Sequence, residues 1–248
     1  MTPAGSRLPG RLMRFPVYGE GVILSEDVLL LLLNDSTGKA AVDTTRLDLA
    51  LAGGVLLDLA TLGRVDVTGP DEQVKKGRLV VRDARPAEDE VLDEALRRIA
   101  AMGPKKPESV LPKLSKGLRQ ALLERLTGRG ILRAQEGRVL GIFPTHSWPA
   151  IDSDHERQVR ASLHDVLVVG RTPAAREAAL VSLLQAIDQV PKVLGDVGIP
   201  ARELRRRAKE VSEGGFADDA IRKAVQAVNA AMTAAIVSAA TVGAISGS

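Results

Sequence analysis

Basic side chains are the groups in this sequence whose types and spacing best suit a chemical role. Five of them follow one another in a leucine-rich stretch: Lys113, Lys116, Arg119, Arg125 and Arg129. If this stretch is one helix, Lys116 and Arg119 are three residues apart on the same face and both reach one anion. A solvated polar face opposite the leucines is the competing interpretation. A second basic run, residues 202–209, is open to the same two interpretations.

Sequence motifs of the common enzyme classes are absent. The chain has no GxxxxGK[ST] phosphate loop, no GxGxxG, no HExxH and no GxSxG. It also has no cysteine, which excludes disulfides, thiolate metal sites and cysteine nucleophiles. His155 and His164 are nine residues apart, so they point to opposite sides of one helix and do not share a metal ion. We therefore expect a non-enzymatic protein without cofactor or metal.

The composition is typical of a folded protein with an aliphatic core. Of 248 residues, 45% are hydrophobic and 26% are charged. Only three Phe, one Trp and one Tyr are present, so Leu, Val, Ile and Ala must fill the core. So few rings also disfavour a platform on which nucleic-acid bases stack. Because the net charge is only +3, an anionic partner would have to meet a local basic patch.

Hydrophobic periodicity predicts a mainly α fold, a single helical domain with one or two short β-hairpins. A short buried helix is expected at 28–33, with Ser25 as its cap. Gly53 and Gly54 lie within the helix predicted at 43–62, which indicates a close backbone neighbour. Further helices are predicted at 89–102, 109–126, 154–170, 173–188, 201–213 and 217–244. The first hairpin pairs 64–68 with 78–82, and the second pairs 131–133 with 138–143 across a turn at 134–137.

The two ends of the chain differ from the middle. Residues 1–20 are rich in Gly, Pro and Arg, and we expect a flexible leader there, ahead of one domain at 21–248. Residues 224–248 carry no charged side chain and are long enough to suggest a transmembrane helix. Alanine contributes little to membrane insertion, and polar residues interrupt the segment. A helix buried among other helices over 224–245 is therefore the better prediction.

Short motifs in a fixed order resemble the Golgi phosphoprotein 3 family. They are Ser-Glu-Asp-Val-Leu-Leu from residue 25, Gly-Gly-Val-Leu-Leu-Asp-Leu from residue 53, Leu-Gly-Arg at 62–64, Asp-Glu-Ala-Leu at 93–96, Leu-Thr-Gly-Arg-Gly-Ile-Leu at 126–132 and Pro-Thr-His at 144–146. The resemblance implies a mostly helical peripheral membrane protein that binds phosphatidylinositol 4-phosphate. An excess of Ala, Arg and Gly is typical of a bacterial member, of actinobacterial type.

The family pocket for the lipid headgroup uses one Trp and three Arg, and the resemblance places Asp43, Ala52, Lys116 and Arg119 at these positions. Lys116 and Arg119 keep the positive charge, whereas Asp43 and Ala52 lose the ring and one cation. We therefore expect binding of anionic headgroups in general rather than tight selectivity. The neighbouring cations Arg46 and Arg125 are assigned to the same site.

The second predicted hairpin carries apolar side chains that suit contact with a membrane: Val139, Leu140, Ile142 and Phe143. The resemblance also implicates this hairpin in self-association and implies binding of protein tails. Together these features predict a protein on the cytoplasmic face of a membrane, with anionic phospholipid as partner.

Two other functions stay open. A helix followed by Gly-Ile-Leu and a two-stranded wing is also the outline of a winged-helix DNA-binding module at 114–143. Glu124 and Glu136 near that face disfavour DNA, so we expect no nucleic acid. The other alternative is a protein-interaction scaffold.

Overall fold

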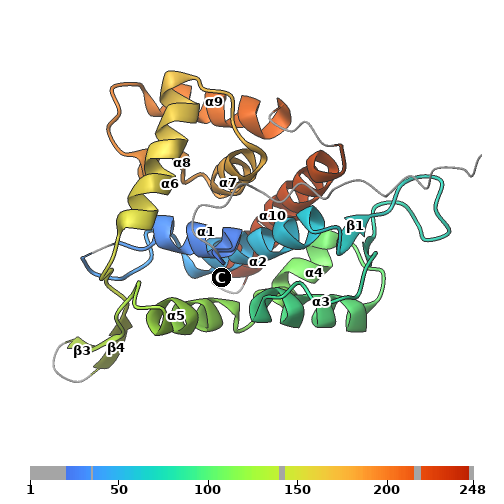
Figure 1. Ribbon diagram of the computed structural model, residues 1–248, viewed down its shortest axis with the longest axis horizontal. Helices are drawn as coiled ribbons and strands as arrows, with labels where there is room; N and C mark the ends of the chain where they lie inside the picture. Colours follow the sequence, from blue (N-terminus) through green and yellow to red (C-terminus); the bar gives the residue numbers. More distant parts are fainter. Residues whose placement is uncertain (1–20, 35, 140–142, 215–218, 246–248) are drawn as a thin grey trace, which may run out of the picture.

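The computed structural model of the chain describes residues 21–34, 36–139, 143–214 and 219–245. Helix α2 (Thr44–Thr61) lies at the centre of the fold. The carboxylate of Asp43 caps α2 by accepting a hydrogen bond from the backbone N–H of Arg46. Helix α2 packs against α1 (Leu24–Leu32), α7 (Ala175–Ala186) and α10 (Asp219–Ile245), and it also contacts the helices between residues 90 and 128 (Figure 1). The leader predicted at 1–20 lies outside the described residues.

Two glycines allow this close packing. A Cβ atom on Gly54 would lie 2.9 Å from the backbone nitrogen of Ser25 in α1. A Cβ atom on Gly53 would lie 2.8 Å from Cδ2 of Leu183 in α7. The prediction of a close neighbour is therefore confirmed at both glycines. The neighbour is backbone at Gly54, whereas at Gly53 it is a side chain.

The remaining helices lie on two sides of this centre (Figure 1). One side holds α3 (Glu90–Met102), α4 (Pro107–Leu114) and α5 (Leu118–Gly128). The other holds α6 (Asp154–His164), which continues as a π-helical turn (Asp165–Val169), together with α8 (Val190–Leu194) and α9 (Ala201–Gly214).

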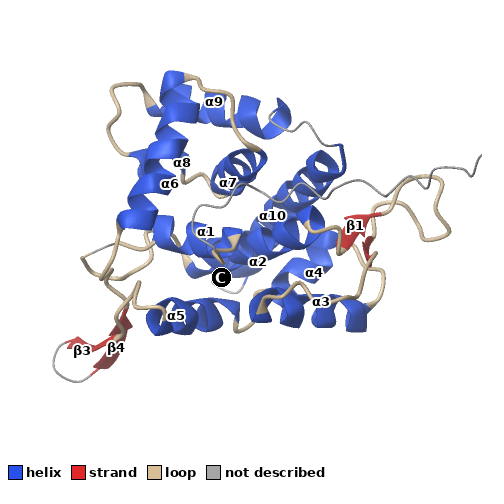
Figure 2. Cartoon of the chain, in the orientation of Figure 1, coloured by secondary structure: helices blue, strands red, loops and turns tan. Residues whose placement is uncertain are grey.

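The strands form two separate antiparallel pairs (Figure 2). β1 (Val65–Val67) pairs with β2 (Leu79–Val81), and β3 (Gln135–Val139) pairs with β4 (Phe143–Ser147). The predicted mainly α fold with short hairpins is confirmed.

The start of α1 differs from the prediction. The N-cap is Ile23, and Ser25 lies fully buried inside the first turn, so it is not the cap. The carboxylate of Glu26 takes the capping role by accepting the N–H of Ile23 at 3.0 Å. Both Glu26 and Asp27 are buried, and their charges are neutralised by cations from other helices, as described below.

The second hairpin is shifted along the chain relative to the prediction. The residues expected to turn at 134–137 belong mostly to β3, and Val139 stands opposite Phe143. The shift arises because Leu132 is buried in the core, 2% exposed. The backbone around it pairs with 149–151, where Ile151 N–H bonds to the carbonyl of Ile131 at 2.9 Å. The hairpin therefore begins only after this pairing ends.

Helix α10 is buried over only part of its length. Its buried side chains are Ala224, Val225, Val228, Ala231 and Met232. Beyond them Ala235 and Ile236 are only partly buried and Val237 is 59% exposed, so the prediction of a buried helix is correct as far as Met232 and too long at Val237. The side chains of 240–245 lie outside the description. Among the described residues, no helix is both long and apolar enough to cross a membrane.

Candidate functional site

Lys116 lies in a turn, and the prediction of one helix that carries both Lys116 and Arg119 is wrong. Helix α4 ends at Leu114, and α5 begins at Leu118. Between them Gly117 has a φ of +76°, a left-handed conformation that costs glycine no Cβ clash. Leu114 and Leu118 are both buried, so the leucine stripe continues across the break.

The turn places Lys116 beside the N-terminus of α5. The guanidinium of Arg98 donates to the carbonyl of Lys116 at 2.9 Å and holds the turn against α3. No side chain caps α5, and its first turn contains Arg119 but no acidic residue. Backbone N–H groups at such a helix end attract anions, and here two cationic side chains accompany them.

Arg119 forms an ion pair with Asp48, an acid of α2. Its Nε atom lies 3.4 Å from Oδ1 of Asp48, and the two side chains are 38% and 25% exposed. Burial raises the pKa of Asp48 above its ordinary value, and the charge of Arg119 opposes that rise. An anion that binds Arg119 must therefore compete with the Asp48 carboxylate.

Two exposed lysines complete this region. Lys113 lies in the last turn of α4, and Lys116 follows it in the turn. Neither forms an ion pair with a side chain in the part of the chain that the structure describes. We refer to Lys113, Lys116 and Arg119 as the α4–α5 basic surface.

Arg125 forms an ion pair with the buried carboxylate of Glu26. Its guanidinium lies 3.1 Å from Glu26 and 2.6 Å from Asp89, and it donates to the carbonyl of Gly21 at 2.8 Å. The Glu26 side chain is 0% exposed, and burial raises its pKa. Arg129 contributes a second cation at 3.2 Å from Glu26. Arg125 thus stabilises the entry of the chain into α1 and is not a free headgroup ligand.

The other sequence-predicted pocket positions do not converge on Arg119. Arg46 lies 3.6 Å from Asp43, the cap of α2. Arg46 and Asp48 are two residues apart, so they project about 200° apart around the helix. Ala52 is fully buried. At this site the structure brings together Lys116 and Arg119, with Lys113 added.

A buried charge cluster joins α1 to three other helices. Asp27 lies 2.7 Å from His155 of α6 and 2.6 Å from Arg176 of α7. In α2, Asp58 accepts the N–H of Leu24 at 2.7 Å, and burial raises its pKa to about 7. Sequence reasoning assigned the acids of α1 to a helix terminus. Two acids directly before the run predicted to be buried at 28–33 were the missed signal, because carboxylates that are buried with it require partners.

The basic run at 202–209 is neutralised locally. Arg206 lies 2.6 Å from Glu203, and Arg205 lies 2.6 Å from Asp188. Arg207 donates to the carbonyls of Leu167 and Val168 in the π-helical turn. This arrangement matches the interpretation of a solvated polar face, and the structure adds that its arginines pair with nearby acids and carbonyls.

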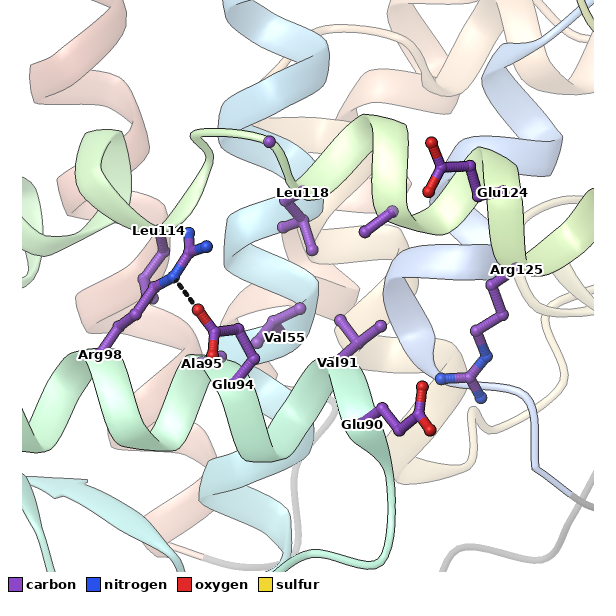
Figure 3. A pocket seen from close by; sticks show the side chains of 12 residues that line it. Val55, Glu90, Val91, Glu94, Ala95, Arg98, Leu114, Leu118, Glu124 and Arg125 are labelled. Atoms are coloured by element: carbon purple, nitrogen blue, oxygen red, sulfur yellow. Dashed lines mark hydrogen bonds and ion pairs between the residues drawn. The ribbon is translucent and has the colours of Figure 1, made fainter.

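A groove of about 440 Å³ lies between α3 and α5, with Val55 of α2 on its floor (Figure 3). Glu90, Glu124 and Arg125 lie toward one end, and Glu94 and Arg98 toward the other (Figure 3). No group of His, Asp or Glu among the described residues is arranged to hold a metal ion.

The predicted membrane-contact hairpin is described only in its strands. β3 and β4 project from one end of the molecule (Figure 1). Leu140 and Ile142 lie outside the described residues, and for Val139 and Phe143 the description covers the backbone pairing alone. At the base of the hairpin the side chain of Ile151 is 59% exposed, which sequence reasoning missed.

Comparison with known families finds a match over most of the chain. The sequence pattern of the Golgi phosphoprotein 3 (GPP34) family matches residues 24–228. This range begins with α1 and extends into α10, so it includes the central helices, the α4–α5 basic surface and both hairpins. The match covers most of the chain, and the chain therefore belongs to the Golgi phosphoprotein 3 family.

Proposed function

We propose that this protein binds anionic phospholipid headgroups at a membrane surface, without catalysis, through the α4–α5 basic surface. The observation that carries the proposal is the pair of exposed lysines, Lys113 and Lys116, beside the uncapped N-terminus of α5. Other cations, such as Arg125 and Arg176, are bound to buried carboxylates and serve the fold. Membership of the Golgi phosphoprotein 3 family is consistent with this role.

The charges at the surface favour anionic lipids in general. Each Lys or Arg close to an anionic membrane contributes about 1 kcal/mol to binding. A tighter, phosphate-selective site would need several converging cations, preferably arginine forks. In this protein Arg119 is paired with Asp48, and neither Ala52, which is buried, nor Asp43, which caps α2, supplies a further cation. We therefore propose modest preference, rather than strict selectivity, for phosphatidylinositol 4-phosphate.

Membrane contact by the β3–β4 hairpin is the second part of the proposal. The exposed Ile151 at its base supports an apolar contact there. A peripheral position on the cytoplasmic membrane face follows from this function. Self-association through the hairpin and binding of protein tails stay predictions, as does the absence of enzymatic activity.

DNA binding is the weaker alternative. A recognition helix in this region would need to present Lys116 and Arg119 together, whereas Lys116 lies in the turn and Arg119 is paired with Asp48. Duplex DNA nevertheless belongs in the binding test as a competitor, because both partners would show salt-sensitive binding.

The test is co-sedimentation of the unmodified protein with vesicles of phosphatidylcholine alone, with added phosphatidylserine, and with added phosphatidylinositol 4-phosphate. We expect binding to both anionic mixtures and little to the neutral one. Lys116→Ala should weaken binding about fivefold, the equivalent of about 1 kcal/mol. The matched control is Lys192→Ala, which removes an exposed lysine from α8 and should bind like the parent. Equal binding to neutral vesicles, or equal loss in both variants, contradicts the proposal.

A further inference from the structure

The positive charge of the chain is concentrated around α4. Residues 103–120 contain five cations and one acid, and hence carry a net charge of +4, whereas the whole chain carries +3. The remainder of the chain is therefore slightly acidic. The α4–α5 basic surface holds three of these five cations, and the other two, Lys105 and Lys106, directly precede α4.

Helix α4 connects these two lysines to the α4–α5 basic surface (Figure 1). Lys106 is the N-cap of α4, and Lys113 follows it by seven residues. Seven residues are within about 20° of two full helical turns, so the two lysines lie on one edge of the helix, about 10 Å apart. Along this edge Lys106, Ser109 and Lys113 are exposed, whereas Val110 and Leu111 are buried in the core.

The β1–β2 strand pair adds a further cation at the start of α4. The backbone N–H of Leu79 donates to the carbonyl of Lys105 at 2.8 Å, and Arg78 directly precedes Leu79. Glu108 is the one acid of residues 103–120. Its pKa lies below the ordinary value because Lys106 donates a hydrogen bond to its carboxylate and the charges of Lys106 and Arg78 add to this effect. The start of α4 is therefore electropositive in spite of Glu108.

The two lysines at the start of α4 are accessible to a partner. Lys105 is exposed and forms no ion pair with a side chain in the described part of the chain. The Nζ atom of Lys106 lies 3.1 Å from Glu108, and these two side chains are 59% and 42% exposed. An exposed ion pair of this kind is weak, so an external anion can replace the Glu108 carboxylate.

This arrangement suits an extended anionic surface better than one small anion. The two ends of α4 are about 10 Å apart, which exceeds the Debye length of about 8 Å at physiological salt, so one phosphate group does not serve both ends. A bilayer with anionic lipids presents charge along the whole helix. The short side chains of Ser109 and Pro112 allow the flexible lysine stems to reach the headgroups, but they provide few groups for reading the base edges of DNA.

We propose that the lipid-binding surface extends along the whole of α4 to Lys105, Lys106 and Arg78, so that this helix lies parallel to an anionic bilayer. This inference rests on the proposed lipid binding at the α4–α5 basic surface. It assigns three further cations to that function and gives the protein an orientation on the membrane.

Co-sedimentation with vesicles of phosphatidylcholine and phosphatidylserine tests the extension. Lys105→Ala with Lys106→Ala should weaken binding about tenfold, because two cations near the lipid are lost and one of them is partly neutralised by Glu108. The matched control, Lys192→Ala with Lys209→Ala, removes two exposed lysines from α8 and α9 and should bind like the parent.

A substitution with the opposite expected effect excludes unfolding as the explanation. Glu108→Gln removes the one acid beside these lysines and should strengthen binding to the same vesicles about threefold. Its control is Glu213→Gln, because Glu213 lies 3.8 Å from Lys209 on α9 and should leave the affinity unchanged.

A fluorescent label tests the orientation. Because the chain has no cysteine, an environment-sensitive fluorophore on Ser109→Cys reports from the α4 edge without background. Its emission should shift to the blue when these vesicles are added. The same fluorophore on Ala201→Cys at the start of α9 should not respond.

The outcomes separate this inference from the proposed function. If the parent does not bind anionic vesicles, both are wrong. If the parent binds and Lys116→Ala weakens binding, the proposed function stands. In that case the extension along α4 is overturned by parent-like binding of the Lys105 and Lys106 double variant, by unchanged affinity of Glu108→Gln, or by an unresponsive label at residue 109. Tighter binding to duplex DNA than to the vesicles at equal ionic strength would overturn it in favour of a nucleic acid.

Discussion

Replacement of Arg125 by alanine is expected to destabilise the fold by about 2–4 kcal/mol. Its guanidinium is the nearest counter-ion of Glu26, whose side chain is 0% exposed. Removal of one partner from a buried ion pair typically costs about 3–5 kcal/mol, because the other charge stays buried. Arg129 remains 3.2 Å from Glu26, and the Arg125 side chain is itself 22% exposed, so the lower part of the range applies.

Urea unfolding followed by circular dichroism measures this loss. With a urea dependence of about 3 kcal/mol per molar, the midpoint should fall by about 1 M. Lys116→Ala is the matched control on the same side of the molecule and should shift stability by no more than about 0.5 kcal/mol, since Lys116 is exposed.

A second substitution separates charge from packing. Adding Glu26→Gln to Arg125→Ala should recover part of the lost stability, because it removes the uncompensated carboxylate and keeps an acceptor for the N–H of Ile23. If Arg125→Ala unfolds at the same urea concentration as Lys116→Ala, Arg125 is not the counter-ion that the structure shows. It would then return as a candidate headgroup ligand.

Three further predictions follow from named contacts. Gly54→Ala should destabilise the protein by about 1–2 kcal/mol, measured by urea unfolding, because the new Cβ atom meets the backbone of α1. Gly53→Ala should destabilise it less, because its Cβ atom meets the ends of side chains. Equal losses of stability in the two variants would contradict this reasoning. Burial raises the pKa of Asp58 from 3.8 to about 7. Between these two pKa values the folded state holds a proton on Asp58 that the unfolded state has released, so the stability of the fold decreases as pH rises. The free energy of unfolding of Asp58→Asn, measured relative to that of the parent, should therefore rise by about 2–3 kcal/mol from about pH 5 to pH 8. A difference between the two proteins that does not change with pH would refute the assignment. Asp48→Asn should increase affinity for anionic vesicles, because it releases Arg119; unchanged or weaker binding would argue against competition by Asp48.

Local signals in the sequence were enough for most of the helices. The spacing of apolar residues predicts α2 and α3 nearly to the residue, because periodicity depends only on neighbours in sequence. In the structure Asp43 and Asp89, the first residues of the two predicted ranges, are the N-caps. The glycine pair of α2 was interpreted correctly for the same reason: two glycines inside a helical stripe need a tertiary explanation.

The errors arose where distant parts of the chain decide the outcome. A stripe through Leu114 and Leu118 is compatible with one helix or with two joined at Gly117, and only packing selects the second. The shift of the β3–β4 hairpin depends on burial of Leu132. The role of Arg125 depends on Glu26, which is remote in sequence, so no local pattern identifies the pair.

The most direct test of the central claim is the affinity of Lys116→Ala with Arg119→Ala for phosphatidylserine-containing vesicles. Loss of two cations worth about 1 kcal/mol each predicts binding weaker by about 30-fold, without a change in the urea midpoint beyond about 1 kcal/mol. Lys192→Ala with Arg202→Ala removes the same charge from α8 and α9 and should bind like the parent. If both double variants bind these vesicles as the parent does, the α4–α5 basic surface is not the lipid site.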